Sequence, residues 1–157
     1  MGLDMYLTRK KFIGAQYEHR NVRGTIYITV EGKEVPIDFN RLSYVEESGI
    51  YWRKANAVHQ WFVNNVQKGT DDCGDYYVSH EKLEELLKLC KAVKKDHDKA
   101  EELLPTQSGF FFGSTEYDEW YFQDIDYTVK ELDRLLKDEK QLNDAGVFSE
   151  FYYHSSW

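Results

Sequence analysis

Hydrophobic and polar residues alternate along the first part of the chain, a pattern that predicts β-strands. Every second residue from Leu3 to Leu7 is apolar, the period expected of a strand that buries one face. Residues 25–30 are β-branched or aromatic, residues 33–39 alternate again, and Glu31-Gly32 between them favours a tight turn. We therefore expect a strand at the start of the chain, followed by a β-hairpin.

Apolar residues recur at steps of three and four in three later segments, which predicts helices packed by one face. The first segment covers residues 52–66. The second begins after Ser79, a residue suited to capping a helix, and extends to Val93. The third begins at Thr115, because Thr115 with Asp118 three residues on resembles a helix start, and we expect it to be the longest helix.

Shorter elements complete the expected fold. Residues 44–50, 75–78 and 147–153 fit strands, and a short helix is expected to end at Leu104. The apolar run Phe110–Phe112 between two glycines indicates a short buried strand or a core plug. The sequence predicts a single α+β domain over residues 1–157, with a small mixed, mainly antiparallel sheet packed with about three main helices.

Composition favours a globular cytoplasmic protein. Hydrophobic residues make up 41% of the chain, enough to build a core. The sequence has neither an apolar run of membrane-spanning length nor the apolar region of a signal peptide. Two cysteines cannot form the disulfide framework of a small secreted domain. We expect Cys90, on an apolar helical stripe, to be buried and Cys73 to be more exposed.

The net charge of −8 is unevenly distributed. Residues 115–144 carry ten carboxylates and four basic side chains, whereas residues 1–30 carry five basic side chains and two carboxylates. An acidic field repels phosphate, so generic nucleic-acid binding is not expected. Such a field would attract a basic protein surface, although the same charges can serve solubility alone.

The sequence lacks the motifs that mark well-known enzyme classes. It has no phosphate-binding Gly-x-x-x-x-Gly-Lys, no dinucleotide Gly-x-Gly-x-x-Gly, no Gly-x-Ser-x-Gly elbow and no His-Glu-x-x-His. We therefore expect no cofactor and no metal, and a non-enzymatic protein is favoured. The absence of these motifs does not exclude an enzyme whose catalytic residues come together only in the folded chain.

The first candidate site lies at the start of the first predicted helix. Trp52, Asn56 and His59 are spaced to share one helical side, and Arg53 lies beside them. Aromatic rings, an amide and a guanidinium can stack on and hydrogen-bond to a nucleotide or another flat ligand. Alternatively, Trp52 and His59 pack against the sheet.

The second candidate is the group of aspartates Asp71, Asp72 and Asp75 around Gly74. Clustered carboxylates can bind hard cations, but the spacing does not match that of a calcium-binding loop. A turn in which the aspartates accept hydrogen bonds from backbone amides is favoured.

The third candidate is the acidic, aromatic start of the last predicted helix. Carboxylates there stabilise the helix dipole, which accounts for part of the cluster without any function. Glu116, Asp118 and Glu119 would suit acid–base chemistry if one were buried beside Trp120. Exposed rings among carboxylates would instead suit a protein interface, whose candidate residues are Glu116, Tyr117, Asp118, Glu119, Trp120 and Asp124.

Four segments, Met1–Leu7, Tyr51–Asn56, Asp71–Ser79 and Ser108–Ser114, resemble a family of small proteins encoded by bacteriophages, prophages and other mobile elements. The resemblance carries over no activity, catalytic residue or cofactor. It implies a phage accessory protein in the bacterial host cytoplasm, acting against a host defence system such as CRISPR.

Three functions follow as hypotheses. The leading hypothesis is a non-enzymatic binder or inhibitor that presents the acidic start of the third helix to a basic surface of a host protein. The second is a nucleotide or small-molecule binding protein, or an enzyme, with a pocket around Trp52, Arg53, Asn56 and His59. The third is a structural accessory of the phage particle.

Overall fold

The computed structural model describes residues 2–14 and 26–157. It is an α+β fold built on a four-stranded sheet with the strand order β4-β1-β6-β5, in which all neighbouring strands are antiparallel. The strands are β1 (Asp4–Phe12), β4 (Tyr44–Arg53), β5 (Tyr76–Val78) and β6 (Phe148–Ser156). The predicted fold class is confirmed.

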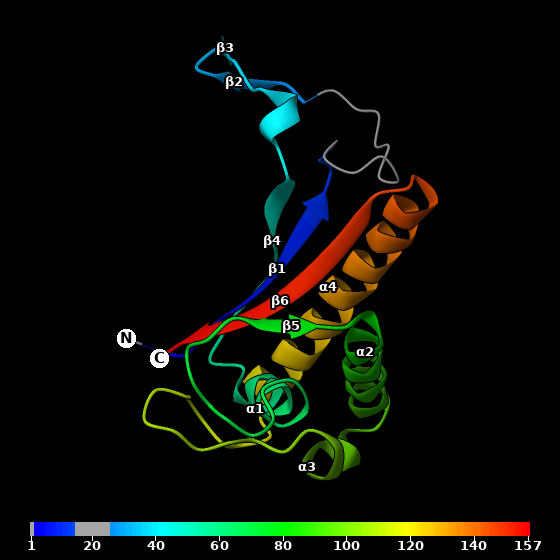
Figure 1. Ribbon diagram of the computed structural model, residues 1–157. Helices are drawn as coiled ribbons and strands as arrows, with labels where there is room; N and C mark the ends of the chain where they lie inside the picture. Colours follow the sequence, from blue (N-terminus) through cyan, green and yellow to red (C-terminus); the bar gives the residue numbers. More distant parts are fainter. Residues whose placement is uncertain (1, 15–25) are drawn as a thin grey trace.

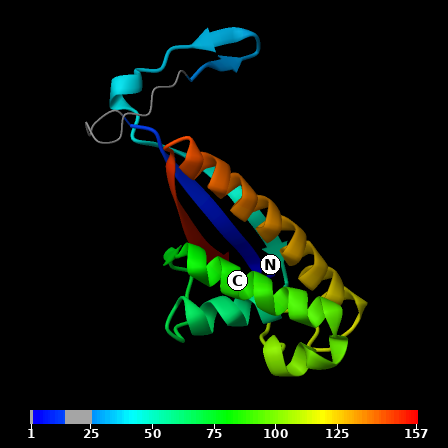
Figure 2. The same cartoon turned by 90° about the vertical axis from the view of Figure 1, so that its right-hand side faces the viewer.

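Three helices lie on one face of this sheet, as Figures 1 and 2 show. They are α1 (Asn56–Asn65), α2 (His80–Lys95) and α4 (Glu119–Asp144). Between α2 and α4 the chain forms the 3-10 turn η2 (His97–Lys99) and the short α3 (Ala100–Leu103). The hydrophobic core therefore lies between the sheet and these helices.

Alternation along β1 places the core residues as the sequence predicts. Leu3, Met5 and Leu7 are fully buried, whereas Tyr6 and Thr8 are partly exposed on the opposite face. Strand β1 is central because it pairs with both β4 and β6.

One of the two predicted helix starts is confirmed, at Ser79, whereas the cap of α4 is Asp118 and not Thr115, so this helix begins later than predicted. The Ser79 hydroxyl accepts a hydrogen bond from the backbone N–H of Lys82 at the start of α2. A carboxylate oxygen of Asp118 accepts from the N–H groups of Trp120 and Tyr121, which fixes the start of α4 at the next residue. Cys90 is buried within α2, as expected, and Cys73 is exposed.

The predicted hairpin is present but stands apart from the main sheet. Strands β2 (Ile28–Val30) and β3 (Lys33–Val35) form a separate two-stranded sheet joined by a turn at Glu31-Gly32. Both strands are exposed along their whole length, and the hairpin projects away from the body of the molecule (Figure 1). β3 ends just before Pro36, which lacks the amide hydrogen that a further ladder bond needs. Thr25, the first residue of the predicted hairpin, lies outside the described residues.

The 3-10 turn η1 (Phe39–Arg41) leads from the hairpin back to β4.

Two local predictions were wrong. Trp52 and Arg53 belong to β4 and not to a helix, because the strand continues until Lys54 adopts a left-handed conformation with φ of 60°. The run Phe110–Phe112 forms a turn and not a strand, and Phe110 is 94% exposed, so the alternative of a core plug holds for Phe112 alone. The Phe112 N–H donates to the Gly109 carbonyl, so the run folds back on itself and cannot extend as a strand.

Among the described residues, no helix combines the length and apolar character needed to span a membrane.

Candidate functional site

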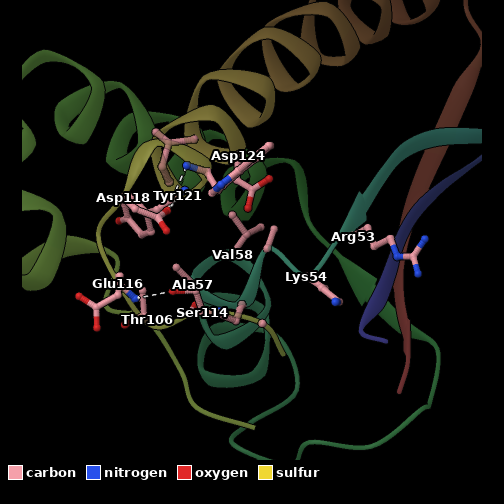
Figure 3. A pocket seen from close by; sticks show the side chains of 15 residues that line it. Arg53, Lys54, Ala57, Val58, Thr106, Ser114, Glu116, Asp118, Tyr121 and Asp124 are labelled. Atoms are coloured by element: carbon pink, nitrogen blue, oxygen red, sulfur yellow. Dashed lines mark hydrogen bonds between the residues drawn. The ribbon is translucent and has the colours of Figure 1, made fainter. Parts of the chain in front are cut away.

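A cavity of about 340 Å³ lies where the starts of α1 and α4 meet the loop between α3 and α4. Figure 3 shows the side chains that line it. Three segments that are distant in sequence supply the walls. They are residues 53–58, the loop residues Thr106, Gly113 and Ser114, and the α4 group of Glu116, Asp118, Trp120, Tyr121, Asp124 and Ile125.

The turn from β4 into α1 forms the first wall. The left-handed backbone of Lys54 lets the chain leave the sheet and begin a helix at Asn56. Arg53 lies at the edge of this wall, and its guanidinium points away from the α4 carboxylates (Figure 3). Its Nε is 4.0 Å from a carboxylate oxygen of Asp4.

Asn56 holds the loop that forms the second wall. Its side-chain nitrogen donates to the carbonyls of Phe112, at 3.0 Å, and Ser114, at 2.8 Å. Its side-chain oxygen accepts from the N–H of Gln107 at 3.1 Å. The buried amide of Asn56 is therefore engaged with the protein itself, and its role at the cavity is to fix the loop.

The start of α4 forms an outward-facing third wall. Glu116 and Glu119 are exposed, and the Trp120 ring is 72% exposed. Tyr117 is half-buried, and its hydroxyl accepts a hydrogen bond from the N–H of Thr106. The acid–base interpretation required Glu116, Asp118 or Glu119 to be buried beside Trp120. Glu116 and Glu119 are exposed, and Asp118 is only half-buried, with one carboxylate oxygen accepting hydrogen bonds from the N–H groups of Trp120 and Tyr121.

Asp124 is a half-buried carboxyl at the cavity. Burial raises its pKa to about 6, and the neighbouring charge of Asp118 acts in the same direction. Both carboxyl groups line the cavity (Figure 3). A positive charge placed between them would stabilise the ionised form of Asp124 and would itself be stabilised.

Trp52 and His59 lie in the core rather than at the cavity. The indole N–H of Trp52 donates to the Thr128 hydroxyl at 2.9 Å. The Nδ1 atom of His59 lies 2.7 Å from the Tyr153 hydroxyl, and its Nε2 lies 3.1 Å from a carboxylate oxygen of Asp71. Of the four residues in the first candidate site, the structure therefore brings only Arg53 and Asn56 to the cavity.

Sequence reasoning missed that two candidate sites meet. Arg53 and Asn56 come from the first, whereas Glu116, Asp118, Trp120 and Asp124 come from the third. Nothing in the local sequence signals this contact, because it depends on how α4 crosses the sheet. The remaining interface candidates, Tyr117 and Glu119, lie beside the cavity without lining it.

The aspartate-rich turn is confirmed as a hydrogen-bonded turn. One carboxylate oxygen of Asp72 accepts from the N–H of Gly74 at 2.9 Å, and the Tyr76 hydroxyl also donates to this carboxylate. Asp71 accepts from the indole N–H of Trp157 as well as contacting His59. Within residues 2–14 and 26–157, no cluster of three or more potential ligand side chains could hold a metal ion.

No protein-family model, curated protein or solved structure significantly matches this chain.

Proposed function

We propose that this chain is a non-enzymatic binding protein that accepts a positively charged side chain of a protein partner in the cavity between α1 and α4. The observation that carries the proposal is the position of Trp120. Its ring is 72% exposed at a cavity that Glu116, Asp118 and Asp124 also line. An indole face is the best aromatic partner for a cation, and adjacent carboxylates add a charge-assisted hydrogen bond.

The outward orientation of this region supports the proposal. Glu116, Glu119 and Trp120 are exposed, and none of them is engaged by the basic residues of β1. Those residues pair elsewhere: Arg9 and Lys11 with Glu47, and Lys10 with Glu46. The acidic surface at the start of α4 is thus available to a partner.

NMR titration of the whole chain with N-acetyl-arginine amide tests the binding step directly. We expect the indole N–H resonance of Trp120 and the backbone amide of Asp124 to shift together. Replacing Trp120 with Ala should weaken this binding about tenfold, the effect of removing an aromatic anchor. Shifts confined to other parts of the chain would overturn the proposal.

The resemblance to phage-encoded proteins supports a host-defence protein as the partner, bound in the bacterial cytoplasm. A basic nuclease surface of a CRISPR system has the complementary charge. Inhibition of purified CRISPR nucleases should fall when Glu116 and Glu119 are both changed to Lys. The matched control changes Glu101 and Glu102 of α3 to Lys, since these carboxylates are also exposed. If the two double variants inhibited the nuclease equally well, the acidic surface at the start of α4 would not be the binding surface.

A small molecule is the second candidate occupant. A cavity of about 340 Å³ falls at the lower end of the size range of small-molecule sites. Mass spectrometry of the purified chain under native conditions, compared with the Trp120→Ala variant, distinguishes this occupant. A compound that stays bound to the native chain but not to the variant would favour a small molecule over a protein side chain as the occupant of the cavity.

A further inference from the structure

The sheet face that α1, α2 and α4 leave uncovered carries a cluster of aromatic side chains. We call this surface the open face, and its rings include those of Tyr6, Tyr44, Tyr51, Tyr77, Tyr152 and His154. The ring centroid of Tyr6 lies 5.3 Å from that of Tyr51, and that of Tyr77 lies 6.0 Å from that of Tyr152. Tyr77 is 56% exposed. Exposed rings gathered on one face are typical of an interaction surface.

Three of these rings, those of Tyr6, Tyr152 and His154, line a hollow of about 560 Å³ on the open face. Thr8 is a small residue between Tyr6 and Lys10 along β1, and Tyr152 of β6 is its neighbour across the ladder. A short side chain surrounded by long ones leaves a depression in an otherwise flat sheet. The hollow is lined on other sides by Glu46 and Asp75.

The chain's own Lys10 shows how a cation lies on this surface. Its ammonium nitrogen is 4.6 Å from the ring centroid of Tyr152 and 5.1 Å from that of Tyr44. The same nitrogen lies 3.8 Å from a carboxylate oxygen of Glu46. Ring faces and a carboxylate together therefore stabilise a positive charge here.

The fixed charges of the open face favour a basic ligand. Among the described residues, four carboxylates lie on it, whereas its fixed cations are Lys10 and Arg53. The four are Asp4, which accepts from the Tyr51 hydroxyl, Glu150, which accepts from the Tyr152 hydroxyl, and Glu46 and Asp75 at the hollow. An excess of carboxylates repels a phosphate backbone and attracts lysine or arginine.

We propose that the open face binds a basic peptide segment of a protein partner, with lysine or arginine side chains over the tyrosine rings and near the carboxylates. Charge complementarity selects this occupant over a nucleic acid. The proposal does not depend on the cavity between α1 and α4, since the rings and carboxylates of the open face take no part in that cavity.

Fluorescence anisotropy with a fluorescein-labelled peptide of alternating arginine and serine, added to the whole chain, tests the proposal. Changing both Tyr6 and Tyr152 to Thr should weaken peptide binding about tenfold or more. Changing Asp75 to Lys should also weaken it, and this side chain is 80% exposed, so the fold is retained. The Phe110→Thr variant is the matched control, because this ring is 94% exposed and lines neither the hollow nor the cavity between α1 and α4. Its affinity for the peptide should stay within about twofold.

Four outcomes would overturn the inference. One is unchanged binding of the peptide by both open-face variants. Another is tighter binding of a labelled single-stranded oligothymidine than of the peptide, with loss in the Tyr6 and Tyr152 variant. The third is self-association of the free chain that the same variant abolishes, which would make the open face an interface between two copies. The fourth is loss of peptide binding in the Trp120→Ala variant alone, which would place the peptide in the cavity between α1 and α4 and not on the open face.

Discussion

The Nδ1 atom of His59 lies 2.7 Å from the hydroxyl oxygen of Tyr153, and both residues are fully buried. Burial lowers the pKa of His59, although Asp71 opposes this shift. The neutral imidazole donates from Nε2 to the Asp71 carboxylate, which can only accept, so Nδ1 accepts from the Tyr153 hydroxyl. This contact joins α1 to β6 through the core.

Replacing Tyr153 with Phe should lower the free energy of unfolding by about 1 to 3 kcal/mol, because Nδ1 of His59 would be buried without a donor. Urea denaturation measures the change. Tyr77 is the control, since its ring is exposed, and its replacement by Phe should alter stability by less than about 0.5 kcal/mol. Equal effects of the two replacements would contradict the buried contact.

Asp124 should reduce stability at neutral pH. Its folded pKa of about 6 exceeds the unfolded value, so the folded state holds the proton more tightly and stability falls as pH rises from about 4 to 6. The Asp124→Asn variant should be more stable than the native chain by about 1 kcal/mol at about pH 7, after allowance for solvent screening. The difference should vanish near pH 4. Thermal unfolding across this range measures it.

A carboxyl group that lowers the stability of the fold, as Asp124 should, is typical of a residue that serves binding. If the cavity accepts a cation, Asp124→Asn should be more stable yet bind N-acetyl-arginine amide more weakly. A variant that gains stability and binds equally well would separate the pKa shift from the proposed function.

His80 should link pH to stability in the opposite direction. Partial burial lowers its pKa, but the hydrogen bond and charge of Glu139, together with Glu84, outweigh that effect and raise it. The stabilisation is therefore complete below the unfolded pKa and is lost as pH rises through the folded one. The stability difference between the native chain and His80→Gln should be larger at about pH 5.5 than at about pH 8.5. A pH-independent difference would show that the ionised His80 is not involved.

Most helices and strands, and one part of the candidate site, can be predicted from the sequence. Ser79 marks the start of α2 because capping is local, and the apolar positions of α2 identify its buried face. The start of α4 is predicted too early, at Thr115, because Thr115 and Asp118 have the spacing of a capping pair, yet Asp118 is the cap. Trp52 was placed in a helix because its spacing to Asn56 fits a helical period, yet pairing of β4 with β1 keeps it in a strand. The cavity could not be predicted, since it depends on contacts between segments about 60 residues apart.

Arg9 should be essential to the far end of the sheet. Its side chain is only 4% exposed, and it pairs with Glu47 at 2.7 Å and with Asp138 of α4 at 3.9 Å. Arg9→Ala should lower the free energy of unfolding by about 2 to 3 kcal/mol, because it removes both the buried stem and the shared charge. Lys91→Ala, which breaks the exposed pair with Asp133, should cost less than about 1 kcal/mol.

Asn56 should control the order of the loop over residues 106–114. Asn56→Ala removes three hydrogen bonds to that loop and should cost about 2 to 3 kcal/mol. Limited proteolysis should then cut within the loop, where Phe110 is already exposed. Cleavage elsewhere first would show that Asn56 does not hold this segment.

The β2–β3 hairpin leaves and re-enters the body at neighbouring points, because Phe12 at the end of β1 pairs with Tyr44 at the start of β4. A tight turn joining these two residues would close the sheet without the projection. Evolution can therefore lengthen, shorten or replace this projection while the core stays untouched. Relatives of this chain would be expected to differ most there, and an engineer could use the same place to attach a label or a second binding module.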